Sequence, residues 1–346
     1  MTQLKPGGTA VLAPPPRRRA GLSVVRGKRL PVLITAALLL ALFAAGASRY
    51  QYQGFLSGQV VLNLFIDNGY LIVAAVGATF VILTGGIDLS IGSIIGFTTM
   101  LTAWLVEKEH WPTVLVMVLA LAVGAGAGAL MGAVIHFFEI QPFIVTLAGL
   151  FLFRGLCLVI NKESIAINNP LLINMAVAQI PLPGDIHLSI GAVTAIVVLI
   201  IAAYVLHLTR FGRQVYALGG SEQSSLLMGL PVARTKIGVY TVSGFCSALA
   251  GLLFTLYIQS GDPLHGLGLE LDAIAAVVIG GTLLIGGSGY VFGTLLGVLV
   301  LGLVKTIISF EGTLSSWWAR IFVGVLLLVF ILLQRLIGAR VSKEPA

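Results

Sequence analysis

The stretch TVLVMVLALAVGAGAGALMGAVIHF, from Thr113 to Phe137, contains no Asp, Glu, Lys or Arg. It is longer than the about 20 residues that a straight helical crossing of a bilayer requires. Other apolar runs follow along the chain of 346 residues, of which 58% are hydrophobic and only 10% are charged. A soluble domain carries about 25% charged residues, because charge keeps its surface hydrated. The sequence therefore predicts an integral membrane protein in which lipid solvates the apolar runs.

The predicted fold is an all-α polytopic membrane protein with about ten transmembrane helices. Several apolar segments are shorter than about 20 residues, so we expect some helices to be broken or partly re-entrant. The segments are 31–47, 69–84, 91–106, 113–137, 143–160, 188–208, 236–259, 273–285, 290–309 and 318–333. They belong to one transmembrane domain, residues 31–337, between a basic N-terminal tail, residues 1–30, and a C-terminal tail, residues 338–346.

The positions of Lys and Arg predict the orientation, because these residues accumulate on the cytoplasmic side of a membrane protein. Before the first span lie Arg17, Arg18, Arg19, Arg26, Lys28 and Arg29, and one later loop is flanked by Arg210, Arg213, Arg234 and Lys236. Both termini are therefore expected in the cytoplasm. The net charge of +7 is interpreted as an anchor at the membrane surface rather than as a sign of nucleic-acid binding. The end of the first run, Ala45-Gly46-Ala47, also resembles a signal-peptidase site, but the long basic tail favours a retained signal anchor.

The first polar interruption of the apolar pattern is TGGIDLSIGS, from Thr84 to Ser93. An ionised Asp at mid-membrane costs about 2.5–3.5 kcal/mol, so Asp88 is expected to face a cavity or a partner. Two roles remain open for it. The carboxylate either contacts a substrate directly or caps the following helix by accepting amide hydrogen bonds.

Two later stretches also break the apolar pattern with glycine. IGGTLLIGGSG, from Ile279 to Gly289, separates two apolar segments in the way of broken helices that line a path. RFGRQVYALGGSEQSSLLMGLP, beginning at Arg210, contains a predicted two-turn helix from Ser221 to Met228, with Ser221 as its N-cap and Gly229 at its end. This helix either lies on the inner membrane surface or docks into a groove of another protein.

Two ladders of glycine at four-residue spacing mark close helix packing. They are Gly124, Gly128 and Gly132, and Gly289, Gly293 and Gly297. We expect both to pack within the chain rather than at a subunit interface. No G-x-x-x-x-G-K-[ST] phosphate loop occurs, so the chain is not expected to hydrolyse ATP or to be an enzyme. The histidines show no metal-site spacing, and Cys157 and Cys246 are expected to be inert apolar residues.

Four stretches resemble the permeases of ribose/galactose-type ATP-binding-cassette sugar importers. They are TGGIDLSIGS from Thr84, QPFIVTLAGLFLFRGL from Gln141, RFGRQVYALGGSEQSSLLMGL from Arg210 and ELDAIAAVVIGGTLLIGGSG from Glu270. Within that family, KESIAIN from Lys162, RFGRQVYALGG from Arg210 and FEGTLSSWWAR from Phe310 are most similar to the permeases of the bacterial galactofuranose importer. The resemblance covers residues 55–333 and leaves out the N-terminal tail.

The resemblance implies a multi-pass permease of the bacterial inner membrane that moves a monosaccharide, galactofuranose or a related sugar, by alternating access. It implies a separate ATPase subunit that uses the ATP, an extracytoplasmic sugar-binding protein and a second permease, for which a related chain is favoured over a second copy. No cofactor and no metal are expected on this chain. The rival interpretation is a secondary transporter coupled to protons or sodium, with Asp67, Asn68 and Asp88 as ion ligands.

Two sets of residues are expected to carry the function. Coupling to the ATPase is expected of Arg213, Gly219, Gly220, Ser221, Glu222, Met228 and Gly229. The translocation pathway is expected to include Asp67, Asn68, Thr84, Gly85, Gly86, Asp88, Ser90, Gly280, Gly281, Thr282, Gly286 and Gly287.

Overall fold

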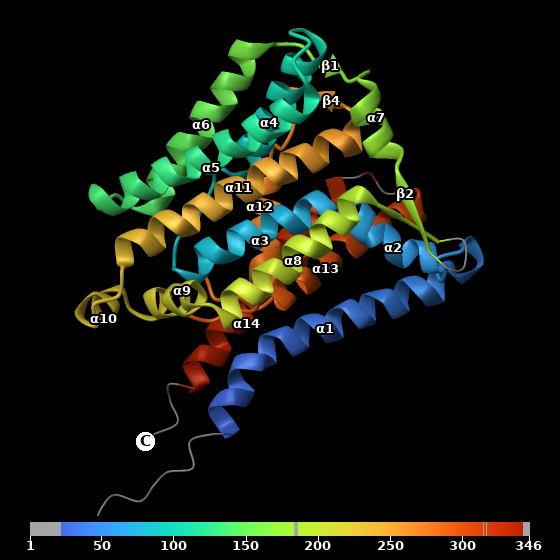
Figure 1. Cartoon of the computed structure of the whole chain (residues 1–346). Helices are drawn as coiled ribbons and strands as arrows, with labels where there is room; N and C mark the ends of the chain where they lie inside the picture. Colours follow the sequence, from blue (N-terminus) through green and yellow to red (C-terminus); the bar gives the residue numbers. More distant parts are fainter. Residues whose placement is uncertain (1–21, 183–185, 314, 316, 342–346) are drawn as a thin grey trace, which may run out of the picture.

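The computed structural model describes residues 22–182, 186–313, 315 and 317–341. The helices before the long connection are α1 Leu22–Tyr50, α2 Gly58–Ile66, α3 Gly69–Leu83, α4 Ile91–Glu107, α5 Thr113–Phe137 and α6 Pro142–Ile160. Those after it are α7 Pro170–Val177, α8 Ile190–Leu208, α9 Arg210–Gly220, α10 Glu222–Leu227, α11 Val232–Ile258, α12 Leu269–Ile279, α13 Val291–Glu311 and α14 Trp317–Val341. They pack into one helical bundle (Figure 1), which confirms the predicted all-α class.

Each predicted apolar segment overlaps a helix, but the structure supports fewer crossings than the predicted number of about ten. Among the described residues, six helices are long and apolar enough to span a membrane, or up to seven if the bent pair α2 and α3 is one span. The other candidates are shorter because turns interrupt the apolar runs: α4 has 17 residues and α12 has 11. The bend of 53° between α2 and α3 is a break of the kind expected from the sequence.

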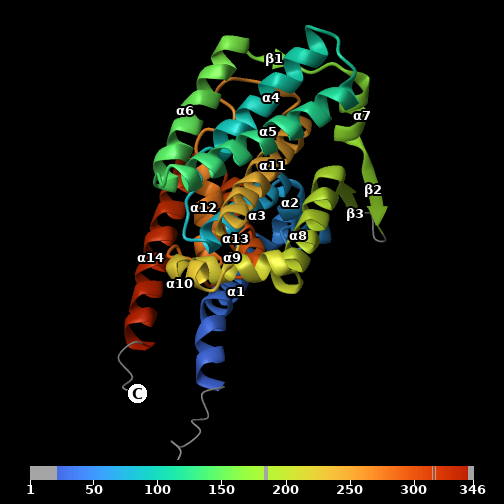
Figure 2. The ribbon, with the colours of Figure 1, turned by 60° about the vertical axis from the view of Figure 1, so that its left-hand side comes forward.

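The start of α1 and the end of α14 lie on the same side of the bundle as α9 and α10 (Figures 1 and 2). Residues 1–21 of the expected basic tail and residues 342–346 of the expected C-terminal tail lie outside the described residues. The first helix begins at Leu22 and contains Pro31, so the helix starts earlier than the predicted span.

Helix α3 lies at the centre of the bundle, where it contacts α8, α11, α12 and α13. Every residue of α3 from Leu71 to Leu83 is buried. A helix that is apolar on all sides is stable only when it is surrounded by other apolar surfaces. The apolar composition of this segment therefore reflects burial within protein, whereas α5, α6 and α8 expose large apolar side chains on the outside of the bundle.

Both glycine ladders bring helices of this chain together, as predicted. A Cβ atom at Gly128 of α5 would lie 2.1 Å from Tyr240 O of α11. A Cβ atom at Gly297 of α13 would lie 1.9 Å from Ala276 O of α12. Any side chain at these positions would push the helices apart, so the ladders allow the close backbone approach that stabilises helix packing in lipid.

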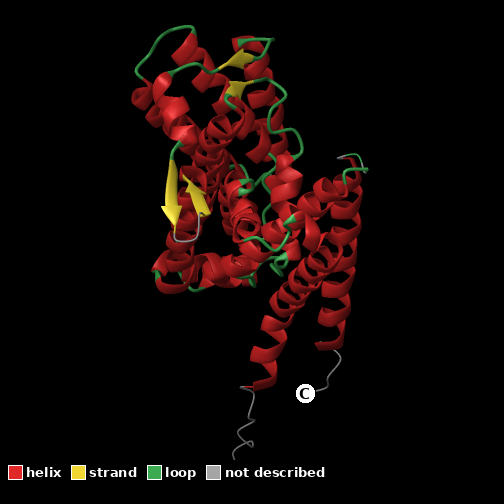
Figure 3. Ribbon diagram, turned by 90° about the vertical axis from the view of Figure 1, so that its right-hand side faces the viewer, coloured by secondary structure: helices red, strands yellow, loops and turns green. Residues whose placement is uncertain are grey.

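The connection between α6 and α8 contains regular structure. Strand β1 (Ile165–Ala166) pairs antiparallel with β4 (Ser260–Gly261), which follows α11. Strands β2 (Gln179–Leu182) and β3 (Ile186–Ser189) form a second antiparallel pair, and both pairs are drawn in yellow in Figure 3. The β1–β4 pair fixes the start of the turn between α11 and α12.

Candidate functional site

Asp88 lies in the turn between α3 and α4, and protein groups donate hydrogen bonds to both of its carboxylate oxygens. Oδ1 accepts from Ser90 N at 2.9 Å and Ser90 Oγ at 2.6 Å, and Oδ2 accepts from Ser243 Oγ of α11 at 2.7 Å. Only 2% of the residue is exposed. Of the two roles left open by the sequence, this geometry favours stabilisation of the turn. The amide that Asp88 binds belongs to Ser90, the residue before α4, rather than to the first turn of the helix.

The three glycine-containing stretches, far apart in the sequence, meet at one place, which we name the glycine junction. Gly287 N donates a hydrogen bond of 2.9 Å to Leu83 O at the end of α3. A Cβ atom at Gly219 of α9 would lie 1.8 Å from the same oxygen and 2.5 Å from Gly287 N. Gly85, Gly286 and Gly287 have φ values of +79°, +86° and +73°, which side-chain-bearing residues rarely adopt. The junction thus joins residues expected at the pathway directly to a residue expected to couple to the ATPase.

Helices α9 and α10 form a short angled unit across the end of the bundle (Figure 2). The Thr209 hydroxyl accepts Gly212 N at 3.2 Å and caps α9, and the Ser221 hydroxyl accepts Ser224 N at 3.2 Å and caps α10. The predicted helix, its N-cap Ser221 and its end near Gly229, which has a φ of +73°, are therefore confirmed. Such caps satisfy amides that have no partner within the helix.

This unit is fixed to the bundle and presents an apolar tip. Tyr216 Oη donates a hydrogen bond of 2.8 Å to Gly289 O, and burial raises the pKa of Tyr216 to about 12, so the hydroxyl keeps its proton. Lys236 Nζ lies 2.6 Å from Glu222 Oε1. Leu227 and Met228 are 85% and 67% exposed, which leaves the tip of α10 free for a partner. The side chain of Arg213 is also exposed.

The remaining residues expected at the pathway occupy tightly packed positions. A Cβ atom at Gly86 would lie 2.5 Å from Tyr240 Oη, and one at Gly280 would lie 2.3 Å from Gly293 O. Gly281 has a φ of +90°. Thr84 Oγ1 donates to Val81 O at 2.8 Å. The Thr282 hydroxyl is buried and has no hydrogen-bond partner among the described residues. Gly220, which was expected to take part in coupling, is exposed with open space around its Cβ position.

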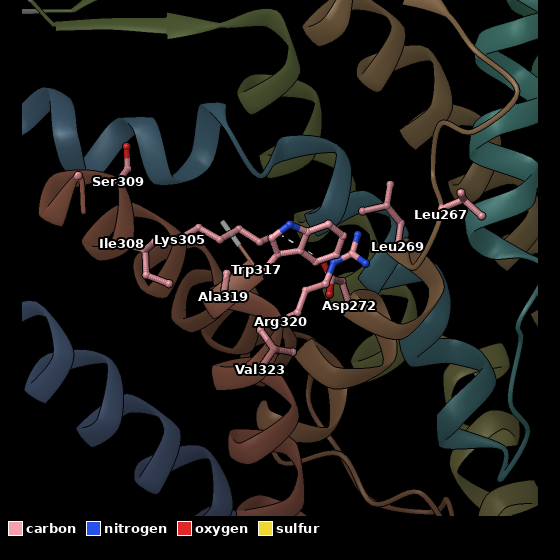
Figure 4. Close-up of a pocket in the computed structure, with 11 residues that line it drawn as sticks. Leu267, Leu269, Asp272, Lys305, Ile308, Ser309, Trp317, Ala319, Arg320 and Val323 are labelled. Carbon is pink, nitrogen blue, oxygen red and sulfur yellow. Dashed lines mark hydrogen bonds and ion pairs between the residues drawn. The ribbon is translucent and has the colours of Figure 1, made fainter. Parts of the chain in front are cut away.

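A pocket of about 680 Å³ lies between the first turn of α12, the last turns of α13 and the start of α14 (Figure 4). We name it the Trp317 pocket. Lys305 Nζ lies 3.2 Å from Asp272 Oδ2, and the guanidinium of Arg320 lies 4.9 Å from the ring centroid of Trp317. The pocket combines an exposed aromatic face with charged hydrogen-bonding groups.

A second pocket of about 400 Å³, the Asn68 pocket, lies where α2 meets α3 and shares Lys305 and Ser309 with the Trp317 pocket. Its wall includes Asp67 and Asn68, the two residues expected at the pathway from this region. Asn68 is buried, and its Nδ2 donates to Leu64 O at 2.9 Å. The polar wall is completed by Asn63, Tyr70, Tyr257 and Thr306.

The two pockets and the glycine junction lie at opposite ends of α3 and α12. Helix α3 begins after Asn68 and ends at Leu83, and α12 begins at Leu269, with Asp272 in its first turn, and ends at Ile279, from which residues 280–287 lead to the junction. At about 1.5 Å per residue, α3 is about 22 Å long and α12 about 16 Å. Each helix therefore connects a pocket wall to the junction.

Four residues of the Trp317 pocket were not predicted from the sequence: Asp272, Lys305, Trp317 and Arg320. A signal existed for Lys305, because it is the only basic residue in the apolar helix α13, and a charge inside a membrane helix usually faces a cavity. Among the described residues, no cluster of three or more His, Cys, Asp or Glu could hold a metal ion.

The structure thus combines long apolar helices, a close-packed glycine junction, two polar pockets and an exposed unit with an apolar tip. Residues 60–331 match the family of the branched-chain amino acid transport system / permease component, and the chain belongs to this family. It is 44% identical to the inner membrane ABC transporter permease protein YjfF of Escherichia coli, over 89% of this chain and 92% of that protein.

Two further relatives extend the comparison. The fructose import permease protein FruG of Bifidobacterium longum is 40% identical over 90% of this chain and 92% of its own. The ribose import permease protein RbsC of Bacillus subtilis is 39% identical over 81% of this chain and 86% of that protein. No solved structure matches. The chain is thus a permease component of an ATP-binding-cassette type of transporter and is not itself an enzyme, as predicted.

Proposed function

We propose that this chain is the membrane-spanning permease subunit of an ATP-binding-cassette importer that carries a monosaccharide, galactofuranose or a related sugar, across the bacterial inner membrane. A separate ATPase uses the ATP, an extracytoplasmic binding protein delivers the sugar, and a second permease, a related chain, completes the pathway. Both termini lie in the cytoplasm. Relatives named for fructose and ribose import support the class of substrate.

The observation that carries this proposal is the pair of pockets that meet at Lys305. Sugar sites combine an aromatic surface, which packs against the apolar face of the ring, with a few placed polar groups that bind hydroxyls. Trp317 is 66% exposed in one pocket, and Asn68 lies in the wall of the other. Across the two pockets, two carboxylates (Asp67 and Asp272) match two cations (Lys305 and Arg320), which suits a neutral ligand.

The same geometry supports alternating access. Movement of α9 and α10 by the ATPase displaces Gly219, which contacts both Leu83 O and Gly287 N at the glycine junction. Helices α3 and α12 carry that displacement to the pocket walls at Asn68 and Asp272, because a short, buried helix moves as a rigid body. In this proposal the glycines expected at the pathway act as its hinge.

Uptake by the reconstituted complex tests the proposal. This permease, the related permease, the ATPase and the binding protein are placed in liposomes, and labelled sugar uptake is measured with ATP or with a non-hydrolysable analogue. We expect saturable uptake that requires ATP hydrolysis and that galactofuranose inhibits more strongly than ribose, fructose or allose. Equal uptake without ATP, driven by a proton or sodium gradient, would establish the secondary-transporter alternative.

A pair of neighbouring tryptophans offers a matched test of the pocket. Trp317 lines the Trp317 pocket, whereas Trp318 points away and packs near Phe322, at 6.4 Å between ring centroids. Trp317→Ala is expected to raise the KM for sugar at least tenfold, or about 1.4 kcal/mol, while Trp318→Ala leaves it unchanged. The same KM for both variants would remove Trp317 from the site.

A further inference from the structure

Arg154 is the only charged residue of α6, a span with a mean hydropathy of 2.4. An Arg inside an apolar helix is costly unless its guanidinium finds partners within the protein. Here Nη1 donates two hydrogen bonds of 2.7 Å, one to Pro263 O and one to His265 O. Both carbonyls belong to the turn between α11 and α12, more than 100 residues away in the sequence. Charge-assisted bonds of this kind are about twice as strong as neutral ones.

Helix α4 provides the surface against which this turn is held. A Cβ atom at Gly96 would lie 2.4 Å from His265 O and 2.9 Å from Arg154 Nη1. One turn earlier, a Cβ atom at Gly92 would lie 2.5 Å from Gly266 O. The two glycines therefore create the space into which the turn and the guanidinium fit, so that the turn is enclosed between α4 and Arg154.

The enclosed turn continues directly into the wall of the Trp317 pocket. Leu267 and Leu269 line that pocket, and Asp272, which pairs with Lys305, follows within the first turn of α12 (Figure 4). The other end of the turn is fixed by the pairing of Gly261 with Ile165. Between these two points, the described contacts that hold the turn to α6 are the bonds from Arg154.

We propose that Arg154 is a positioning residue for the transported sugar: by holding the 263–270 turn against Gly92 and Gly96, it places Leu267, Leu269 and Asp272 around the Trp317 pocket. This inference rests on the proposed sugar site. Arg154 itself lies outside the pocket wall, and its hydrogen bonds to the turn go to carbonyl oxygens. Among the described residues, its Nε and the nearby Glu270 Oε2 are buried without a hydrogen-bond partner, so the hydrogen bonds of the clamp come from Nη1, and the charge of Glu270 adds an electrostatic attraction.

Hydrogen exchange tests the positioning without any sugar. The complex is compared as wild type, Arg154→Gln, Arg154→Lys and the control Lys108→Gln, which removes an exposed cation elsewhere in the chain. The amides of His265, Leu269 and Asp272 donate to local carbonyls and report on the turn. We expect at least tenfold faster exchange of this segment in Arg154→Gln, a smaller increase in Arg154→Lys, and no change in α5 or in the control.

Transport kinetics then separate positioning from general stability. Arg154→Gln is expected to raise the KM for sugar at least tenfold with the maximal rate and the basal ATPase rate retained, and Arg154→Lys is expected to restore part of the affinity. Unchanged exchange in the turn, or a lower maximal rate at constant KM, would overturn the inference. If Arg154→Gln fails to insert, Arg154→Lys is judged by the same criteria. Failure of the proposed function itself would show as absence of ATP-dependent uptake in the wild type.

Discussion

Replacement of Gly219 by Ala tests whether the glycine junction transmits movement. The added Cβ atom would lie 1.8 Å from Leu83 O, whereas ordinary contacts begin at 3.4 Å, so α9 must move away from α3 by about 1.6 Å, the difference between these distances. The same Cβ atom would lie 2.5 Å from Gly287 N, so it also crowds the 2.9 Å hydrogen bond from Gly287 N to Leu83 O. Gly220→Ala is the matched control, because no atom lies within 4 Å of its Cβ position.

The two substitutions should act in opposite directions on stability. Overpacking at Gly219 costs about 1–3 kcal/mol, and loss of the backbone hydrogen bond adds about 0.5–1.5 kcal/mol. Within a helix, Gly→Ala alone is favourable by about 1 kcal/mol, so Gly220→Ala is expected to be neutral or slightly stabilising. The structure therefore predicts that the free energies of unfolding of Gly219→Ala and Gly220→Ala differ by roughly 2–4 kcal/mol.

Coupling is measured as sugar transported per ATP hydrolysed by the complex in liposomes. For Gly219→Ala we expect basal ATP hydrolysis to continue, while its stimulation by sugar-loaded binding protein and the transport rate fall at least tenfold. Gly220→Ala should match the wild type. If both variants transport equally well and unfold at the same temperature, α9 does not act on α3 through this junction.

Three further substitutions probe separate contacts. Asp88→Asn should retain more uptake than Asp88→Leu, because Asn still accepts the hydrogen bond from Ser90 N; equal and complete loss in correctly inserted protein would point to the charge. Glu222→Lys replaces the 2.6 Å pair with Lys236 by repulsion, and we expect more ATP hydrolysed per sugar; an unchanged ratio would exclude Glu222 from coupling. Burial lowers the pKa of His265. Unfolded protein, with a histidine pKa of about 6.5, then binds more protons below that pH, so stability falls as the pH drops. His265→Gln should flatten the dependence of the unfolding temperature on pH; an unaltered slope would contradict this origin.

The positions of the helices could be predicted from the sequence, because a helix that crosses lipid requires an apolar run of about 20 residues. The cap at Ser221 was predictable for a similar reason, since a hydroxyl at the first position of a short helix binds a nearby amide. The number of crossings could not be predicted in the same way. Helix α3 and the second half of α12 have the apolar composition of spans, yet they are buried within protein, and each helix is followed two residues later by a glycine, Gly85 or Gly281, whose positive φ value reverses the chain.

The meeting of distant residues could not be read from local patterns. Gly219 contacts Leu83 and Gly287 through bare backbone, and nothing in the composition of the three stretches specifies their pairing. The Trp317 pocket depends likewise on where α12, α13 and α14 converge. Lys305 was the exception, because an isolated cation in an apolar helix indicates a nearby cavity or partner without any knowledge of the fold.

Helices α3 and α12 are short enough to run from a pocket wall to the glycine junction, whereas a helix that spans the whole bilayer would not. A helix that crossed the whole bilayer would extend past the pocket, and its end would be anchored in the interface rather than free to move. Helix α3 instead runs only from Gly69 to Leu83, and Asn68, directly before its first residue, is buried. The centre of α3 is buried on all sides and closely packed. A displacement at Leu83 O therefore moves the whole helix and reaches the pocket wall at its other end. The bend of 53° between α2 and α3 is the first place where the chain can change direction in response to that movement. It lies at the Asn68 pocket, so the movement would change the shape of the pocket and its affinity for the proposed sugar.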